Sequence, residues 1–309
     1  MDAFQTYHYK VAFALKARSS FGTAFQDFFS TVLEKTHGAN FVRVRAFGSL
    51  GDKGCDGYLT SSGRVYQGFG KLQDAAVSVA TLVQKIENDY KLAATHLNGI
   101  MKEWHFAHNL VDGLPTEAVL KLEAMKKDYP ETVFGLVSPA TLESMTLALS
   151  EPDLLQMLGP AATAEDSRNL NLAEVRAAVD ALIASISQGA VQSSKIQPVP
   201  QDKLAFNKLP DHWVHLIAAG SKNAPHVREY FERHPVAETG DIVAENFSTM
   251  YRALKLENMA PGEIMDALYE RVTGLGFVSA ARQVAAQALL AYLFDACDIF
   301  EDHASKVPA

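Results

Sequence analysis

Two polar residues in the N-terminal part of the chain, Asp56 and Gln67, have the types and the spacing of a divalent-cation site. They fall in two short predicted strands, about 54–60 and 64–69, joined by a hairpin loop at 61–63. Because a tight hairpin sets its strands side by side, both side chains can reach the same edge of the sheet. Carboxylate and amide oxygens are ligands that Mg²⁺ and Mn²⁺ prefer. The pattern therefore predicts a metal site that would support hydrolysis of a phosphodiester by water.

A lysine two residues after the second ligand commonly completes such a site, and this chain has Phe69 at that position. Two other lysines lie nearby in the sequence. Lys71 comes just after the strand, and Lys85 belongs to the helix predicted next. The predicted catalytic residues are therefore Asp56, Gln67, Lys71 and Lys85, of which Asp56 and Gln67 are the predicted metal ligands.

Basic residues are concentrated in the N-terminal part of the chain, around the predicted metal site, although the whole chain is acidic. Residues 1–71 hold nine Lys and Arg against five Asp and Glu, whereas the complete chain has a net charge of −8. The overall charge argues against a protein that simply coats nucleic acid. The local excess suits contact with a phosphate backbone, but an excess of this size is also common on solvated surfaces. The predicted nucleic-acid contacts are Arg43, Arg45, Lys53 and Arg64.

Hydrophobic periodicity predicts an α/β domain over residues 1–160. Residues 4–17 fit either a strand or a helix. The predicted helices cover about 21–37, 72–97, 116–128, 139–149 and 151–158, and the predicted strands cover about 40–46, 54–60, 64–69, 103–108 and 132–137. The first six elements after residue 20 follow the order αβββαβ. A hairpin-rich start followed by a crossover helix predicts a mixed sheet flanked by helices.

The remainder of the chain is predicted to be helical. Residues 161–202 combine a helix at about 166–187 with a polar linker at 188–202 that contains two prolines. Residues 203–309 form a predicted all-α C-terminal domain. Its predicted helices cover about 208–220, 223–234, 240–257, 261–273 and 279–302.

Composition places the chain among soluble two-domain proteins. It has 309 residues, of which 48% are hydrophobic and 21% are charged. No apolar run is long enough to span a membrane, and the N-terminus lacks the pattern of a signal peptide. The two cysteines form no disulfide framework. These features predict a cytoplasmic protein with no membrane association.

Three sequence segments carry a family resemblance. The run Gly51-Asp52-Lys53-Gly54-Cys55-Asp56-Gly57, the tripeptide Val65-Tyr66-Gln67 and the preceding helical tripeptide Ala24-Phe25-Gln26 resemble the PD-(D/E)XK nuclease superfamily, and within it the Mrr-like restriction endonucleases. The resemblance implies an αβββαβ nuclease core and Mg²⁺ or Mn²⁺ as cofactor. It assigns Asp56 to the metal-binding aspartate and Gln67 to the Glu/Gln position that precedes the lysine.

Two positions depart from the pattern of that superfamily. Phe69 replaces the lysine, and Gln26 stands where related nucleases often carry glutamate. The departures leave open whether the chain is a working Mg²⁺-dependent endodeoxyribonuclease or a degenerate, catalytically inactive relative.

A narrower resemblance covers more of the chain. Residues 51–59, 85–89, 104–109, 113–115 and 297–301 are similar to proteins of bacterial ABC-three-component-type conflict systems, which are encoded beside an ATPase and are thought to act in anti-phage defence. This resemblance implies a partner ATPase. The first hypothesis is therefore a nuclease-fold subunit of an antiviral defence system that hydrolyses DNA. The second is an inactive module that senses DNA or acts as a scaffold, with its helical domain docked on the ATPase or on a second copy.

Overall fold

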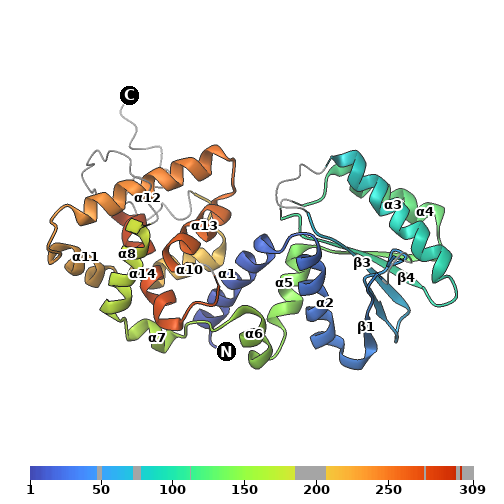
Figure 1. The fold of residues 1–309 in the computed structure, drawn as a ribbon, viewed down its shortest axis with the longest axis horizontal. Helices are drawn as coiled ribbons and strands as arrows, with labels where there is room; N and C mark the ends of the chain where they lie inside the picture. Colours follow the sequence, from blue (N-terminus) through green and yellow to red (C-terminus); the bar gives the residue numbers. More distant parts are fainter. Residues whose placement is uncertain are drawn as a thin grey trace. The chain divides into compact units, whose positions relative to one another are not determined.

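The computed structural model describes residues 1–46, 51–71, 78–111, 113–184, 207–274, 276–296 and 300. The chain divides into two compact units, shown in Figure 1. One unit is Lys16–Asp153, here called the α/β unit. The other combines Met1–Leu15 with Leu154–Ala309 and is called the helical unit. The predicted linker at 188–202 lies outside the described residues.

The α/β unit contains a five-stranded mixed sheet, which confirms the predicted sheet type. The strands are β1 (Phe41–Arg43), β2 (Gly57–Leu59), β3 (Arg64–Phe69), β4 (Glu103–His108) and β5 (Val133–Val137). They lie in sequence order across the sheet. The pairs β1–β2 and β2–β3 are antiparallel, whereas β3–β4 and β4–β5 are parallel. The switch from hairpin to crossover connections thus occurs at β3.

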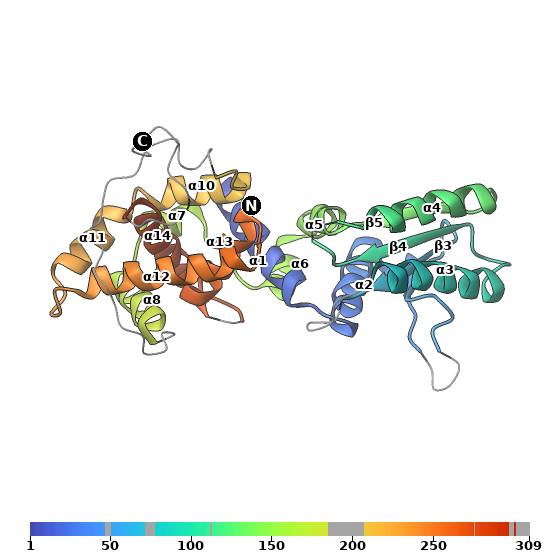
Figure 2. The ribbon, with the colours of Figure 1, turned by 90° about the horizontal axis from the view of Figure 1, so that it is seen from above.

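Helices cover both faces of this sheet. The α/β unit contains α2 (Thr23–His37), the short 3₁₀ helix η1 (Gly38–Asn40), α3 (Val79–His96), α4 (Thr116–Asp128) and α5 (Pro139–Leu147). Neighbouring side chains on β3 point to opposite faces. Tyr66 contacts Phe29 of α2 with ring centroids 5.6 Å apart, whereas Val65 packs in the same core as Ile86 of α3. Figure 2 shows α3 and α4 side by side.

Local sequence signals explain where these helices begin and what they bury. Ser78 caps α3, because its hydroxyl accepts the N–H of Thr81 at 3.1 Å. Ser138 caps α5 in the same way, and Pro139 occupies the first helical position, where its missing N–H is tolerated. The apolar positions of α2 recur at helical spacing, and the helix buries Phe25, Phe28, Phe29, Val32 and Leu33.

The helical unit is mostly helical, as predicted for the C-terminal part. It contains most of α1 (Ala3–Ser19) and of α6 (Glu151–Leu158), which cross the unit boundaries. Its other described helices are α7 (Ala164–Arg168), α8 (Leu172–Ala184), α10 (Asp211–Gly220), α11 (Ala224–Glu232), α12 (Thr239–Leu256), α13 (Pro261–Thr273) and α14 (Ala280–Ala296). Among the described residues, no helix is both long enough and apolar enough to cross a membrane.

Helix α14 is the centre of the helical unit. Every side chain from position 284 to position 294 is buried, and a helix that is apolar around its whole circumference belongs inside a protein core. It packs against α8, α10 and α11. The single polar residue in this stretch, Gln287, donates to the carbonyl of Leu216 at 2.6 Å, so its burial is compensated.

Candidate functional site

Asp56 and Gln67 lie directly opposite each other across the β2–β3 hairpin. The last pair in the ladder joins Gly57 to Tyr66, and one further hydrogen bond of 2.8 Å runs from the N–H of Asp56 to the carbonyl of Tyr66. Asp56 and Gln67 therefore form the next pair, just before β2 begins. Both are buried, with 6% and 1% of their surface exposed. The structure thus brings together the two residues predicted to bind metal.

The carboxylate of Asp56 has one occupied oxygen and one open oxygen. Oδ2 accepts the N–H of Gly68 at 2.8 Å and the side-chain Nε2 of Gln26 at 3.0 Å. Gln26 also donates to the carbonyl of Gly68 at 3.3 Å, so α2 is tied to the hairpin at this point. Oδ1 accepts no hydrogen bond from any residue that the structure describes. This oxygen is the one available to a ligand.

The surroundings of Asp56 make it a weaker acid than an ordinary aspartate. Burial raises its pKa to about 6, and the charges of Asp52 and Asp89 act in the same direction. The N–H of Gly68 and the ammonium of Lys85 oppose this rise. The carboxylate is therefore mostly ionised at neutral pH and becomes protonated in mildly acidic solution.

The amide of Gln67 presents a second oxygen at the same place. Its Oε1 is buried and accepts no hydrogen bond from the described residues. An unsatisfied buried acceptor costs about 1–3 kcal/mol. A carboxylate oxygen and an amide oxygen fit Mg²⁺ or Mn²⁺, which commonly take one or two protein ligands and complete their shell with water and substrate phosphate. Within the described part of the chain, no three His, Cys, Asp or Glu side chains form a denser metal cluster.

The two predicted lysines have different surroundings. Lys85 on α3 forms an ion pair with Asp89, one turn further along, at 2.8 Å, and its charge acts on Asp56. Lys71 is exposed, and its backbone N–H donates to Oδ1 of Asn109 at 2.8 Å. Of the two, Lys85 is the lysine with an electrostatic effect on the buried carboxylate.

Asp89 belongs to the site as well, because it pairs with Lys85 and its charge acts on Asp56, and it is not among the predicted site residues. The signal in the sequence that could have pointed to Asp89 is its position four residues after Lys85, which is the spacing of a helical ion pair. Asp52 has a local role in its turn, because its Oδ1 accepts the N–H of Gly54 at 3.0 Å. Phe69, at the position expected for a lysine, packs into the core beside Phe106, with ring centroids 6.1 Å apart.

Three of the four predicted nucleic-acid contacts are held by acids within the α/β unit. The ion pairs join Arg43 to Glu34 at 2.6 Å, Arg45 to Asp27, and Arg64 to Glu103 at 2.5 Å. Lys53 lies in the turn between Asp52 and Gly54, with a φ of 59°. Partly exposed ion pairs contribute only about 0–1 kcal/mol, so a phosphate can compete for these guanidinium groups.

The raised pKa of Asp56 predicts a difference in pH dependence between the wild type and Asp56→Asn. Between about pH 4 and pH 6 the carboxyl ionises in the unfolded chain while the folded chain keeps its proton. The free energy of unfolding of the wild type should therefore fall across this window, relative to that of Asp56→Asn, and the difference should be constant above it. Urea denaturation of both proteins from pH 4 to pH 8 measures this difference, and parallel curves would contradict the prediction.

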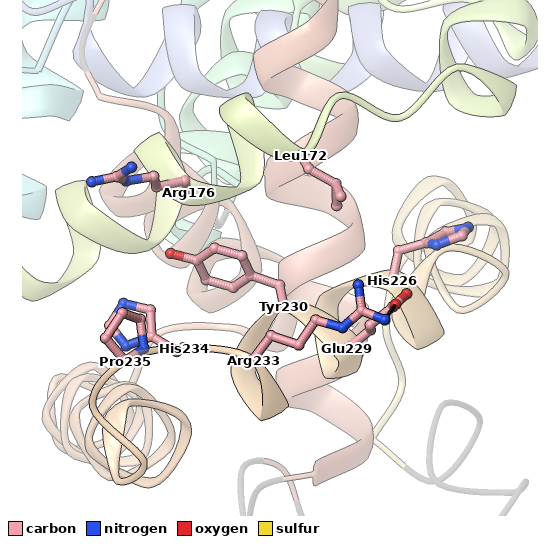
Figure 3. Close-up of a pocket in the computed structure, with 8 residues that line it drawn as sticks. All are labelled: Leu172, Arg176, His226, Glu229, Tyr230, Arg233, His234 and Pro235. Atoms are coloured by element: carbon pink, nitrogen blue, oxygen red, sulfur yellow. Dashed lines mark ion pairs between the residues drawn. The ribbon is translucent and has the colours of Figure 1, made fainter.

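A separate pocket lies in the helical unit between α8 and α11. Its volume is about 310 Å³, and Figure 3 shows Leu172 and Arg176 of α8 on one side and residues of α11 on the other. It is lined by Leu172, Arg176, His226, Glu229, Tyr230, Arg233, His234 and Pro235. Arg233 pairs with Glu229 at 2.6 Å, and Arg176 lies 3.7 Å from Asp180. The pocket combines apolar walls with two exposed arginines.

Comparison with known families finds a match that covers this pocket. Residues 171–301 match a family described as C-terminal domain 10 of the ABC-three component (ABC-3C) systems. The match spans less than half of the 309 residues. It places this part of the chain in ABC-three-component systems, which are anti-phage conflict systems, and so confirms that expected link. No curated protein and no solved structure matches the chain.

Proposed function

We propose that this protein is a nuclease-fold subunit of a bacterial anti-phage defence system and that its α/β unit hydrolyses DNA phosphodiesters with Mg²⁺ or Mn²⁺. The family match of residues 171–301 supports the link to defence. The pairing of Asp56 with Gln67 supports the chemistry, because it sets an open carboxylate oxygen opposite an unpartnered amide oxygen. This pairing is the observation that carries the proposal.

The residues around this pair have distinct roles in the proposed reaction. Asp56 and Gln67 would hold the cation, which when bound makes a water molecule a better nucleophile and offsets charge on the phosphate. The N–H of Gly68 and the amide of Gln26 orient the carboxylate. Lys85, kept in place by Asp89, supplies positive charge beside the site. Arg43, which ends β1 and lies opposite Gly57 of β2, and the nearby Arg45 would contact the DNA backbone.

The test is cleavage of double-stranded DNA by the complete protein, with and without its partner component, in Mg²⁺ or Mn²⁺ and in EDTA. Cleavage that requires the metal supports the proposal. Absence of cleavage in every condition, with the partner present and Mn²⁺ bound, would refute the nuclease reaction.

A second candidate function is a catalytically silent module that senses DNA or acts as a scaffold. Two observations favour it. Phe69 fills the expected lysine position with core packing, and Gln26 contributes a hydrogen-bond donor to Asp56, where a glutamate would offer another acceptor for a cation. This function is distinguished by phage protection that survives Asp56→Ala, since an inactive scaffold does not need the carboxylate.

We further propose that the helical unit binds the partner ATPase through the pocket between α8 and α11. A partner segment with Asp or Glu beside an apolar side chain would fit, because Arg176 and Arg233 border the apolar walls of Leu172 and Tyr230. The double variant Arg176→Glu/Arg233→Glu should weaken partner binding about tenfold or more, chiefly through slower association. Surface plasmon resonance measures this change. Arg252→Glu, a charge reversal at another exposed arginine on α12, is the control and should bind as the wild type does. An equal loss in the control would contradict this contact.

A further inference from the structure

The β5 strand is an exposed apolar edge of the sheet. It is the last strand in the sheet order, and among the strands that the structure describes it pairs with β4 alone. Its five residues carry no charge, and Val133 and Leu136 are 60% and 42% exposed. Sheet edges in soluble proteins usually carry charges, prolines or bulges that prevent another strand from pairing with them. Within its five residues, β5 has none of these charges or prolines.

The backbone of β5 also points donors and acceptors away from the sheet. Val133 donates its N–H to the carbonyl of Lys102 at 3.1 Å and pairs with Glu103 in parallel register. In a parallel ladder only alternate residues bond to a given neighbour. Phe134 and Leu136 therefore direct their N–H and C=O groups outward, and no described residue outside the sheet bonds to either N–H.

We propose that this edge binds the β5 edge of a second copy of the chain, antiparallel about a two-fold axis through Gly135. In this register Phe134 lies opposite Leu136 of the second copy, and both have outward backbone groups that can exchange hydrogen bonds. Val133 lies opposite Val137, so every pair is apolar and no like charges meet. The two Gly135 residues meet at a non-hydrogen-bonded position, where the Cα atoms approach to about 4.5 Å.

The sequence of β5 favours a second copy over an unrelated strand. In an isologous interface each residue meets a residue of the same patch, and Val-Phe-Gly-Leu-Val has an apolar side chain at every position except Gly135, so the strand is complementary to its own copy. Pro130 and Pro139 flank the strand and limit the ladder, because proline has no N–H to donate. By contrast, β1 at the other edge has three residues and includes the charged Arg43.

The neighbouring helix adds apolar surface to this edge. Val119 of α4 is 44% exposed. Lys121, two residues away, turns toward α3 and pairs with Glu87 at 2.6 Å. Residues two apart on a helix point in nearly opposite directions, so Val119 faces away from α3, and α4 itself packs against β5.

Sedimentation equilibrium of the complete protein tests this interface. The wild type should sediment at twice the monomer mass, and Leu136→Lys should raise the dimer dissociation constant roughly 100-fold, because it places an unpaired ammonium in the apolar ladder. Val133→Lys, at a more exposed position, should act in the same direction. Leu92→Lys on α3 is the matched control, since Leu92 is 44% exposed, and it should remain dimeric. Circular dichroism verifies that each variant is folded.

Three results would overturn the proposal. The first is a wild type that stays monomeric at about 100 μM. That result is also expected if this edge pairs only with a different protein. The second is a dimer that both folded edge variants leave intact. The third is equal dissociation in Leu92→Lys.

Discussion

Asp56→Asn should remove Mn²⁺ binding from the α/β unit and, with it, the proposed cleavage of DNA. The substitution retains the size of the side chain and an oxygen that can accept the N–H of Gly68, so the hairpin should keep its structure. It removes the negative charge that a hard cation requires. The affinity for Mn²⁺ should fall about 100-fold or more, and cleavage should fall to the level measured in EDTA.

Isothermal titration with Mn²⁺ at pH 7.5 measures the first effect, because the Asp56 carboxyl, with a pKa of about 6, is ionised there. Glu87→Gln is the matched control. Glu87 lies on α3 and is held by Lys91 and Lys121 at the surface, so its loss should leave Mn²⁺ binding unchanged. Wild-type affinity in Asp56→Asn would exclude Asp56 as a metal ligand. Loss of binding together with full cleavage would place the nuclease chemistry elsewhere.

Gly54→Ala should destabilise the α/β unit by about 3 kcal/mol or more, a large effect for a single added methyl group. Gly54 has a φ of 73°, a conformation that costs an L-residue about 1–2 kcal/mol. In addition, a Cβ on Gly54 would overlap the backbone carbonyl oxygen of Asp89 on α3. A backbone atom cannot rotate away, so the whole turn that carries Asp56 must shift.

Gly51→Ala separates the two causes. Gly51 lies in the same turn with a φ of 67°, but a Cβ there would meet no atom within 4 Å. It should cost only the conformational part, about 1–2 kcal/mol. Native-state hydrogen exchange of the β3 and β4 amides measures both losses within the α/β unit. Equal losses in the two variants would show that contact with α3 does not restrict this turn.

The sequence located best the strands whose pattern is not broken by turn residues. The bounds of β3 and β4 agree with the predicted ranges 64–69 and 103–108. By contrast, β1 and β2 are shorter than predicted. At β2 the turn that Asp52 closes on Gly54 takes up the first of the predicted strand positions.

The N-terminal segment could not be assigned because hydrophobicity does not mark its buried face. The buried positions 5, 9, 13 and 17 of α1 recur at helical spacing, but the polar Gln5 and His8 are among its buried residues, so the apolar pattern does not reveal the helix. Its surroundings in the helical unit decide its structure. Val11 packs in a core made otherwise of residues after position 170, and no local pattern encodes such a contact.

Only some of the contacts in the candidate site could be predicted from the sequence. The pairing of Asp56 with Gln67 follows from a short hairpin and was predictable. The hydrogen bond from Gln26 to Asp56 joins residues 30 positions apart, and the approach of α3 brings Asp89 close to the turn at Gly54. Both depend on how helices pack on the sheet, which sequence spacing does not specify.

The division of the chain into units has a consequence for the order of folding during synthesis. The α/β unit is one continuous segment, Lys16–Asp153, whereas the helical unit combines Met1–Leu15 with Leu154–Ala309. On the ribosome the α/β unit therefore has all its residues before most of the helical unit exists. The first helix must wait for its partners: Asp2 accepts the N–H of Ala164 at 3.0 Å, and α14 supplies the centre of the core in which Val11 packs. In topological terms, the α/β unit is a domain inserted near the start of the helical unit, and the helical unit completes its folding last.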